Sequence, residues 1–167
     1  MSRGNLGVGL IVGALVLVAV AQGAFAATSE QDLVARGRYL SSVAGCNDCH
    51  TPGYLLNEGK VPEAQWLTGS NFGWRGPWGT TYATNLRLFM ANLTEDEWLV
   101  TAKNLKARPP MPWFTVNEMH DDDLRAIYRY VRHLGPGGQE APAYVPPDQE
   151  PPQPYALFPS PPPAKKE

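Results

Sequence analysis

The sequence has few cysteines and little excess of charge of either sign. Only two cysteines occur in 167 residues, and lysine and arginine total 14 against 16 aspartates and glutamates. The formal net charge of −2 leaves no basic surplus of the kind that binds nucleic acid, so we expect no nucleic-acid partner. The chain has no internal repeat, and no alternation of strands and helices surrounds the cysteines. These absences favour one small domain with a single core.

The one long apolar run lies near the N-terminus. Arg3 precedes an uncharged apolar run at residues 6–21, and Ala-Phe-Ala at 24–26 has the small-x-small pattern of a cleavage site. Residues 1–26 are therefore predicted to be an export signal. The alternative is an uncleaved membrane anchor, because residues 6–27 are about long enough to cross a bilayer once. Both interpretations place the rest of the chain outside the cytoplasm, and we expect it in the periplasm, either free or anchored.

The two cysteines belong to a Cys46-x-x-Cys49-His50 motif. This spacing is typical of c-type haem attachment. On a short helical turn, each thiol can form a thioether with one haem vinyl group. The histidine that follows then lies against the haem plane, where its imidazole can ligate iron. Because the motif occurs once, the sequence predicts one covalently attached haem c.

Three other uses of paired cysteines fit the sequence less well. A thioredoxin-like redox pair follows a strand in an α/β unit, and no such unit surrounds Cys46. Structural zinc usually takes four ligands, whereas the remaining histidines, His120 and His133, are distant in the sequence and lack metal-ligand spacing. A structural disulfide suits an exported protein but leaves His50 unexplained. We therefore favour haem.

Three stretches carry helical signals, and a long irregular region separates the first two. Residues 29–45 are predicted to form a helix with a serine cap, and a capping box at 94–97 begins a second helix that reaches about residue 107. Apolar residues recurring on one face predict a third helix at 121–134. Residues 51–93 show no sustained periodicity, so we predict a long loop that wraps a haem edge.

The C-terminal part of the chain has a different composition. Eleven of the 17 prolines fall between Pro136 and Pro163. Residues 136–167 are therefore predicted to be an extended or disordered tail, acting as a spacer, as a docking strip or as plain solvated chain. The predicted organisation is an export signal at 1–26, a domain at 29–135 and this tail.

The group opposite His50 would decide the chemistry of the iron. Met111 stands among three prolines, which fix the backbone on both sides. A methionine has no core to fill in such a loop, so Met111 is our predicted second axial ligand. An open sixth position is the alternative. Other candidates have simpler explanations in packing or in helix capping: Met90, Met119, His120 and His133.

Residues 30–135 resemble the class I cytochrome c family. The likeness rests on the order of a helix, the Cys-x-x-Cys-His motif, a loop-rich middle, a Met-Pro loop and a terminal helix. It implies an all-α cytochrome c fold of three to four helices and long loops around one haem. The first and last helices would cross, with Gly37 meeting Tyr128.

Two shorter stretches resemble haem domains of exported bacterial dehydrogenase complexes. These are residues 76–85 and the segment from Met111 to Tyr128. By this likeness, four residues would line a haem edge and bind the propionates: Trp78, Tyr82, Asn85 and Arg75. The partners implied are redox proteins, such as a membrane-bound dehydrogenase or a terminal oxidase.

These features predict an electron carrier and no substrate chemistry, because no catalytic dyad or nucleophile arrangement stands out. His50 and Met111 would hold the iron of a mono-haem cytochrome that carries single electrons between periplasmic or membrane-bound partners. One alternative is a fixed haem subunit of a larger dehydrogenase or oxidase complex, with the proline-rich tail as its contact. Another is a haem enzyme or gas-binding protein with an open sixth site, for which His120 would be the distal base.

Overall fold

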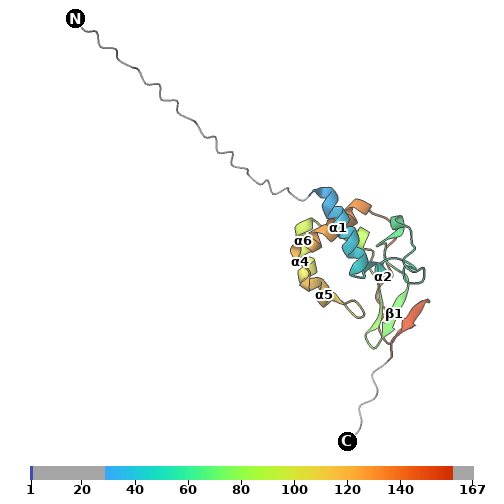
Figure 1. Ribbon diagram of the computed structural model, residues 1–167. Coiled ribbons are helices and arrows are strands. Elements are labelled where there is room, and N and C mark those ends of the chain that lie inside the picture. Colours follow the sequence, from blue (N-terminus) through green and yellow to red (C-terminus); the bar gives the residue numbers. More distant parts are fainter. Residues whose placement is uncertain (2–28, 160–167) are drawn as a thin grey trace.

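A computed structural model describes Met1 and residues 29–159 of the chain (Figure 1). Nearly all of the predicted export signal, residues 1–26, therefore lies outside the described residues and stays a prediction. Within the described part there are six α-helices, a single-turn 3-10 helix and three short strands, in this order: α1 (Glu30–Val43), α2 (Cys46–His50), η1 (Glu63–Gln65), β1 (Gly73–Gly76), β2 (Gly79–Tyr82), α3 (Leu86–Ala91), α4 (Glu95–Lys103), α5 (Trp113–Glu118), α6 (Asp121–Leu134) and β3 (Tyr155–Leu157). None of the helices in residues 29–159 is long and apolar enough to cross a membrane.

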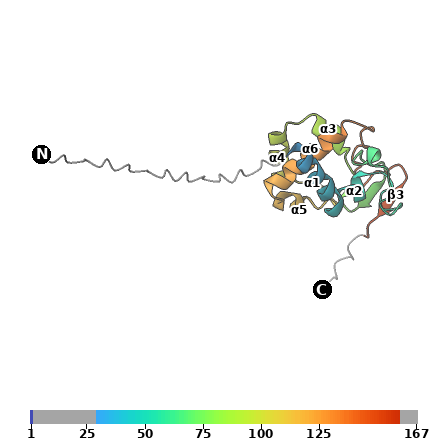
Figure 2. The same cartoon turned by 45° about the horizontal axis from the view of Figure 1, so that its top comes forward.

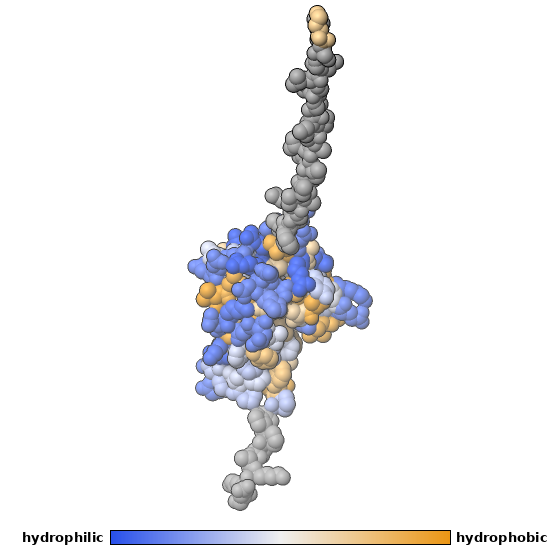
Figure 3. All heavy atoms as spheres, turned by 60° about the vertical axis from the view of Figure 1, so that its left-hand side comes forward, coloured by the Kyte–Doolittle hydropathy of each residue, from blue (hydrophilic) through white to orange (hydrophobic). Residues whose placement is uncertain are grey.

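The helices gather on one side of the molecule and the strands on the other (Figures 1 and 2). Helices α1, α4, α5 and α6 form the helical side, and α2 connects it to the part of the molecule that holds the sheet. The face in Figure 3 is mostly hydrophilic, with smaller apolar areas between the polar ones. The arrangement leaves α2, with both cysteines and His50, at the boundary between helices and sheet.

The predicted helix starts are confirmed because their caps are local. Ser29 and Asp32 form a capping box at α1, and Thr94 and Glu97 form one at α4. Helix α6 has the predicted bounds. Helix α4 ends at Lys103 rather than near residue 107, and α5 was not predicted.

Helices α1 and α6 cross at Gly37, as predicted, but with a different neighbour. A Cβ at Gly37 would lie 1.9 Å from the Ala126 carbonyl oxygen and 2.7 Å from the Tyr130 Cβ. The predicted contact with Tyr128 is wrong. Residues four apart share a helix face, whereas a residue two positions away points elsewhere. The hydroxyl of Tyr128 instead donates a hydrogen bond to the Leu93 carbonyl oxygen, 2.7 Å away.

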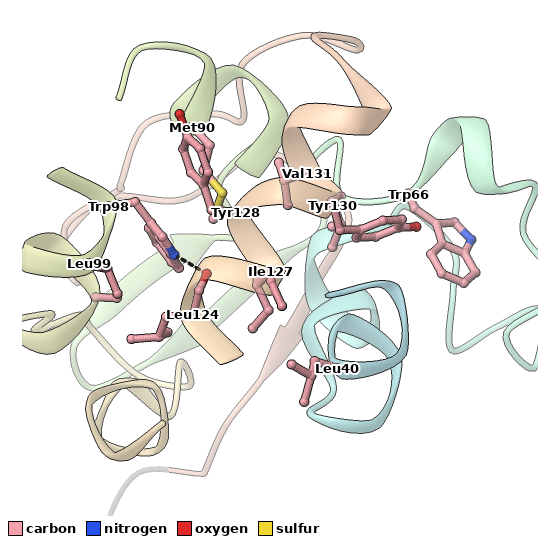
Figure 4. Close-up of a cluster of buried hydrophobic side chains, with 13 residues drawn as sticks. Leu40, Trp66, Met90, Trp98, Leu99, Leu124, Ile127, Tyr128, Tyr130 and Val131 are labelled. Carbon is pink, nitrogen blue, oxygen red and sulfur yellow. Dashed lines mark hydrogen bonds between the residues drawn. The ribbon is translucent and has the colours of Figure 1, made fainter. Parts of the chain in front are cut away.

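The core lies around α6 (Figure 4). Helix α6 contributes a continuous buried face, and Trp98 of α4 donates from Nε1 to the Leu124 carbonyl at 2.9 Å. Met90 is 0% exposed and belongs to this core, which is the packing role favoured from the sequence. The apolar residues of the core are Leu40, Trp66, Leu67, Met90, Trp98, Leu99, Ala102, Leu124, Ala126, Ile127, Tyr128, Tyr130 and Val131.

The expectation of an all-α fold needs correction, because the described residues contain a three-stranded sheet in the order β2-β1-β3. Strands β1 and β2 form an antiparallel hairpin in which Gly73 pairs with Tyr82 and Gly76 with Gly79. Strand β3 pairs with β1 in parallel. Strands of three or four residues are too short to show an alternating pattern, and β3 comes from far along the chain. The predicted loop at 51–93 therefore holds a hairpin and helix α3.

The C-terminal segment is extended, as predicted, but residues 136–159 are not disordered. Asn85 is 2% exposed and donates from Nδ2 to the carbonyls of Gly137 and Gln139 at 2.8 and 3.0 Å. Further along, β3 lies beside β1 (Figure 1). Proline-rich chain cannot build a core of its own, but its carbonyls can accept hydrogen bonds from an existing domain. Composition alone does not reveal these partners.

Candidate functional site

Cys46, Cys49 and His50 all lie on the five-residue helix α2, which follows α1 directly. Gly45 makes the turn between the two helices with a φ of 73°, in the left-handed region that favours glycine. Both cysteines are free and partly buried, and His50 is 8% exposed. The motif therefore forms the short helical turn that was expected of it.

The ring of His50 is oriented by a backbone carbonyl. Its Nδ1 lies 2.7 Å from the carbonyl oxygen of Thr84. A carbonyl only accepts, so Nδ1 carries the proton and Nε2 keeps a free lone pair. Burial lowers the pKa of His50, which keeps the ring neutral. Metal-ligating histidines commonly have this arrangement, in which one nitrogen donates to a carbonyl and the other binds the metal.

Buried hydrogen bonds hold α2, which carries His50, in place. The Thr51 hydroxyl donates to Asn47 Oδ1 at 2.7 Å and accepts from the Leu67 amide at 2.8 Å. The Gly69 amide donates to the His50 carbonyl at 2.8 Å. Asn47 occupies one of the two x positions of the Cys-x-x-Cys-His motif, and it is fully buried. The loop after α2 thus secures the helix that carries His50.

The surroundings of the two thiols do not suit redox exchange or zinc. Burial raises the pKa of Cys46 to about 11 and also raises the pKa of Cys49. A thioredoxin-like pair needs the opposite shift, because the thiolate is the attacking form. Among residues 29–159, no group of three or more His, Cys, Asp or Glu side chains is placed to hold a metal ion. A structural zinc site therefore finds no ligand set in the described residues.

Met111 lies in the loop between α4 and α5, partly buried. The Thr81 hydroxyl of strand β2 donates to the Pro109 carbonyl at 2.7 Å, and the Trp113 amide donates to the Met111 carbonyl at 2.9 Å. Thr84, which orients His50, is only three residues beyond Thr81, a span of roughly 10 Å of extended chain. Residues 81–84 therefore bind both the ring of His50 and the loop that carries Met111.

Met90 and Met119 have the packing roles expected of them, whereas His120 lacks the capping bond expected of its side chain. Met119 packs against the core at the start of α6, where Leu124 is fully buried. His120 is the N-cap residue of α6, exposed and without a side-chain capping bond. His133 is exposed in the last turn of α6. Met90 is in the core, so Met111 is the one candidate in a loop beside the hairpin.

Trp78 and Tyr82 carry polar atoms that no described protein group satisfies. The Nε1 of Trp78 and the hydroxyl of Tyr82 are both buried without a hydrogen-bond partner in residues 29–159. Burial raises the pKa of Tyr82, so its hydroxyl stays protonated and remains a donor. Buried donors without partners are rare in proteins and indicate a missing acceptor. A haem propionate, the partner that the family likeness predicts for these two residues, would supply such acceptors.

Asn85 and Arg75 have other partners than those expected. Asn85 caps α3 and donates from Nδ2 to the carbonyls of Gly137 and Gln139 at 2.8 and 3.0 Å. Arg75 donates from Nη1 to the Gln149 carbonyl at 2.8 Å and pairs with Glu150 at 3.4 Å. Both side chains therefore bind the C-terminal segment.

Sequence reasoning missed the residues that act through their backbone or through distant contacts. Thr84 contributes a carbonyl, which any residue type could supply. Thr81 and Tyr144 act on segments that are distant in the sequence. No pattern of residue types marks such contacts, so only the folded chain reveals them.

The chain is similar to the fructose dehydrogenase cytochrome subunit of Gluconobacter japonicus. The two are 26% identical over 115 residues, which is 63% of this chain and 22% of that protein. The chain thus spans about a fifth of the length of this relative. No protein-family profile matches the chain, and no solved structure matches it. The likeness to a cytochrome subunit agrees with the class of protein that the Cys-x-x-Cys-His motif predicts.

Proposed function

We propose that this protein is a mono-haem c-type cytochrome that transfers electrons. The observation that carries the proposal is the hydrogen bond between His50 Nδ1 and the Thr84 carbonyl. It turns a histidine next to two free thiols into a preoriented metal ligand. The likeness to a cytochrome subunit supports the same conclusion, because cytochromes contain haem. We also propose that the helical part of the molecule has the cytochrome c fold.

Each residue of the site has a distinct part in this proposal. Cys46 and Cys49 would hold the haem through their sulfurs, and His50 Nε2 and the Met111 sulfur would be the iron ligands. When bound, haem supplies a one-electron couple between ferrous and ferric iron. The Thr84 carbonyl makes His50 a stronger donor, and a methionine sulfur favours the ferrous state. Two protein ligands leave no position for a substrate, so we propose electron transfer rather than catalysis.

The hairpin β1–β2 would cover one edge of the cofactor. Trp78 Nε1 and the Tyr82 hydroxyl would donate to propionate oxygens, which supply the acceptors that both donors lack in the protein. A charged acceptor strengthens such bonds.

The proposed setting is the periplasm, with a dehydrogenase as redox partner. Residues 1–26 would direct export and either leave or remain as an anchor. The relative is a cytochrome subunit of a fructose dehydrogenase, so we favour a subunit that takes electrons from a dehydrogenase over a freely diffusing carrier. The substrate of that dehydrogenase is not implied by a chain that covers 22% of the relative.

The test begins with the mature protein, produced in a host that attaches haem c. Its mass should show one haem added and residues 1–26 removed or retained. The ferric protein should show the sulfur-to-iron charge-transfer band, and Met111→Ala should abolish it. Met119→Leu is the matched control and should retain the band, because Met119 packs on the core.

Two results would refute the proposal, and a third would change its second ligand. A mass without haem would reject the cytochrome itself. Rapid carbon monoxide binding by the unmodified ferrous protein would show an open sixth position and favour a gas-binding or enzymatic role. Loss of the band in Met119→Leu, with its retention in Met111→Ala, would move the second ligand to Met119.

A further inference from the structure

The loop that carries Met111 contacts the C-terminal segment as well as the hairpin. The guanidinium of Arg108 lies over the ring of Tyr144, 3.9 Å from its centroid. The hydroxyl of Tyr144 donates to the Trp78 carbonyl at 2.8 Å. One tyrosine thus joins the loop before Met111 to the turn of the hairpin. We call residues 144–158 the C-terminal strap.

The backbone of the strap is paired at this point. Val145 and Thr80 exchange two hydrogen bonds of 3.0 and 2.7 Å, which form an isolated antiparallel bridge. Gly79 makes the close approach sterically feasible. A Cβ there would lie 2.5 Å from the Val145 carbonyl oxygen and 2.7 Å from the Tyr144 hydroxyl. The hairpin turn is therefore shaped to accept the strap.

The Met111 loop is consequently held from two sides. Thr81 of β2 binds the Pro109 carbonyl, and Tyr144 of the strap stacks on Arg108. Prolines on both sides of Met111 limit how far the loop bends between these points. A movement of the loop backbone that carries Met111 away must therefore break these contacts.

We propose that Tyr144 is a positioning residue that makes the Met111 ligand resistant to displacement by external ligands. This inference rests on the proposed function, in which Met111 binds the iron. An external ligand binds iron only while the loop is open, so its apparent affinity scales with the open fraction. The strap lowers that fraction and keeps the protein an electron carrier. Without it, the same chain would become a ligand-binding haem protein.

Imidazole binding to the ferric protein measures the open fraction. Tyr144→Leu removes both the cation–π contact and the hydroxyl bond, and we expect roughly tenfold tighter apparent imidazole binding. Tyr144→Phe keeps the ring over Arg108 and should give about a threefold effect. Arg108→Gln should also give about threefold, because it removes the cation from an exposed position.

Tyr155 provides a matched control on the same strap. Its ring also faces an arginine, Arg75, at 5.8 Å, and its hydroxyl also donates to a neighbour, Glu150, at 2.7 Å. Strand β3, which contains Tyr155, pairs with β1 rather than with the Met111 loop. Tyr155→Leu should therefore lower thermal stability without changing imidazole affinity. A purely structural role of Tyr144 would make the two leucine variants behave alike in both measurements.

The outcomes separate this inference from the proposed function. If Met111→Ala retains the charge-transfer band, Met111 is not the ligand, and both proposals on this residue fall. If Met111→Ala abolishes the band while Tyr144→Leu and Tyr155→Leu bind imidazole equally, only the role of Tyr144 falls. Should Tyr144→Leu fail to retain haem, Arg108→Gln decides, and unchanged imidazole affinity in that variant overturns the inference.

Discussion

The crossing of α1 and α6 at Gly37 leads to a prediction with a magnitude set by the structure. An added Cβ would lie 1.9 Å from the Ala126 carbonyl oxygen, 2.5 Å from its carbon and 2.7 Å from the Tyr130 Cβ. Two of these three atoms are backbone, which cannot rotate away. The helices would have to separate by on the order of 1 Å to restore van der Waals distances.

Two opposing terms decide the effect of Gly37→Ala. Alanine in a helix interior gains about 0.5–1 kcal/mol over glycine, because it restricts the unfolded chain. Overpacking of a close helix contact costs about 1–3 kcal/mol, and a backbone clash lies at the upper end of that range. Separation would also loosen the packing of Leu40, which is 8% exposed. We therefore expect a net loss of about 2 kcal/mol in the free energy of unfolding.

Urea unfolding of the purified protein, followed by circular dichroism, measures this loss. Val43→Ala is a suitable control on the same helix, because Val43 is 59% exposed. It should change the unfolding free energy by less than about 0.5 kcal/mol. A Gly37→Ala protein as stable as the original, or more stable, would show that the helices do not approach as closely as described.

Two further predictions concern the carboxylate of a cap and a buried arginine. Hydrogen bonds from Thr94 hold the pKa of Glu97 below its ordinary value of 4.5. The contribution of this carboxylate to folding stability is therefore present above pH 4.5 and is lost as pH falls through the lowered pKa. Urea unfolding should therefore find Glu97→Gln less stable than the original at pH 7, and the two should converge at low pH. Arg87→Met should cost about 3 kcal/mol by the same assay, because Arg87 is buried and its loss leaves the carbonyls of Leu134 and Ala64 without this donor. A cost below about 1 kcal/mol would mean that water replaces the guanidinium.

The elements predicted correctly are those whose signals are local. Ser29 and Thr94 each cap a helix through a residue three positions away, so the sequence alone locates both starts. The sheet was missed because its pairing is not local. Strand β3 lies far along the chain from its partner β1, and neither strand is long enough to show an alternation of apolar and polar residues. The order of the C-terminal segment was missed for the same reason, since its partners, such as Asn85, belong to the domain.

The candidate site divides in the same way. The five residues from Cys46 to His50 are enough by themselves to predict haem attachment, because two thiols and an imidazole at this spacing are typical of c-type haem sites. The orientation of His50 depends on the Thr84 carbonyl, and the placement of Met111 on Thr81 and Tyr144. A backbone carbonyl carries no mark of residue type, and a contact between distant segments exists only after folding. The sequence thus determined which groups are present, and the tertiary structure decided which contacts orient and hold them.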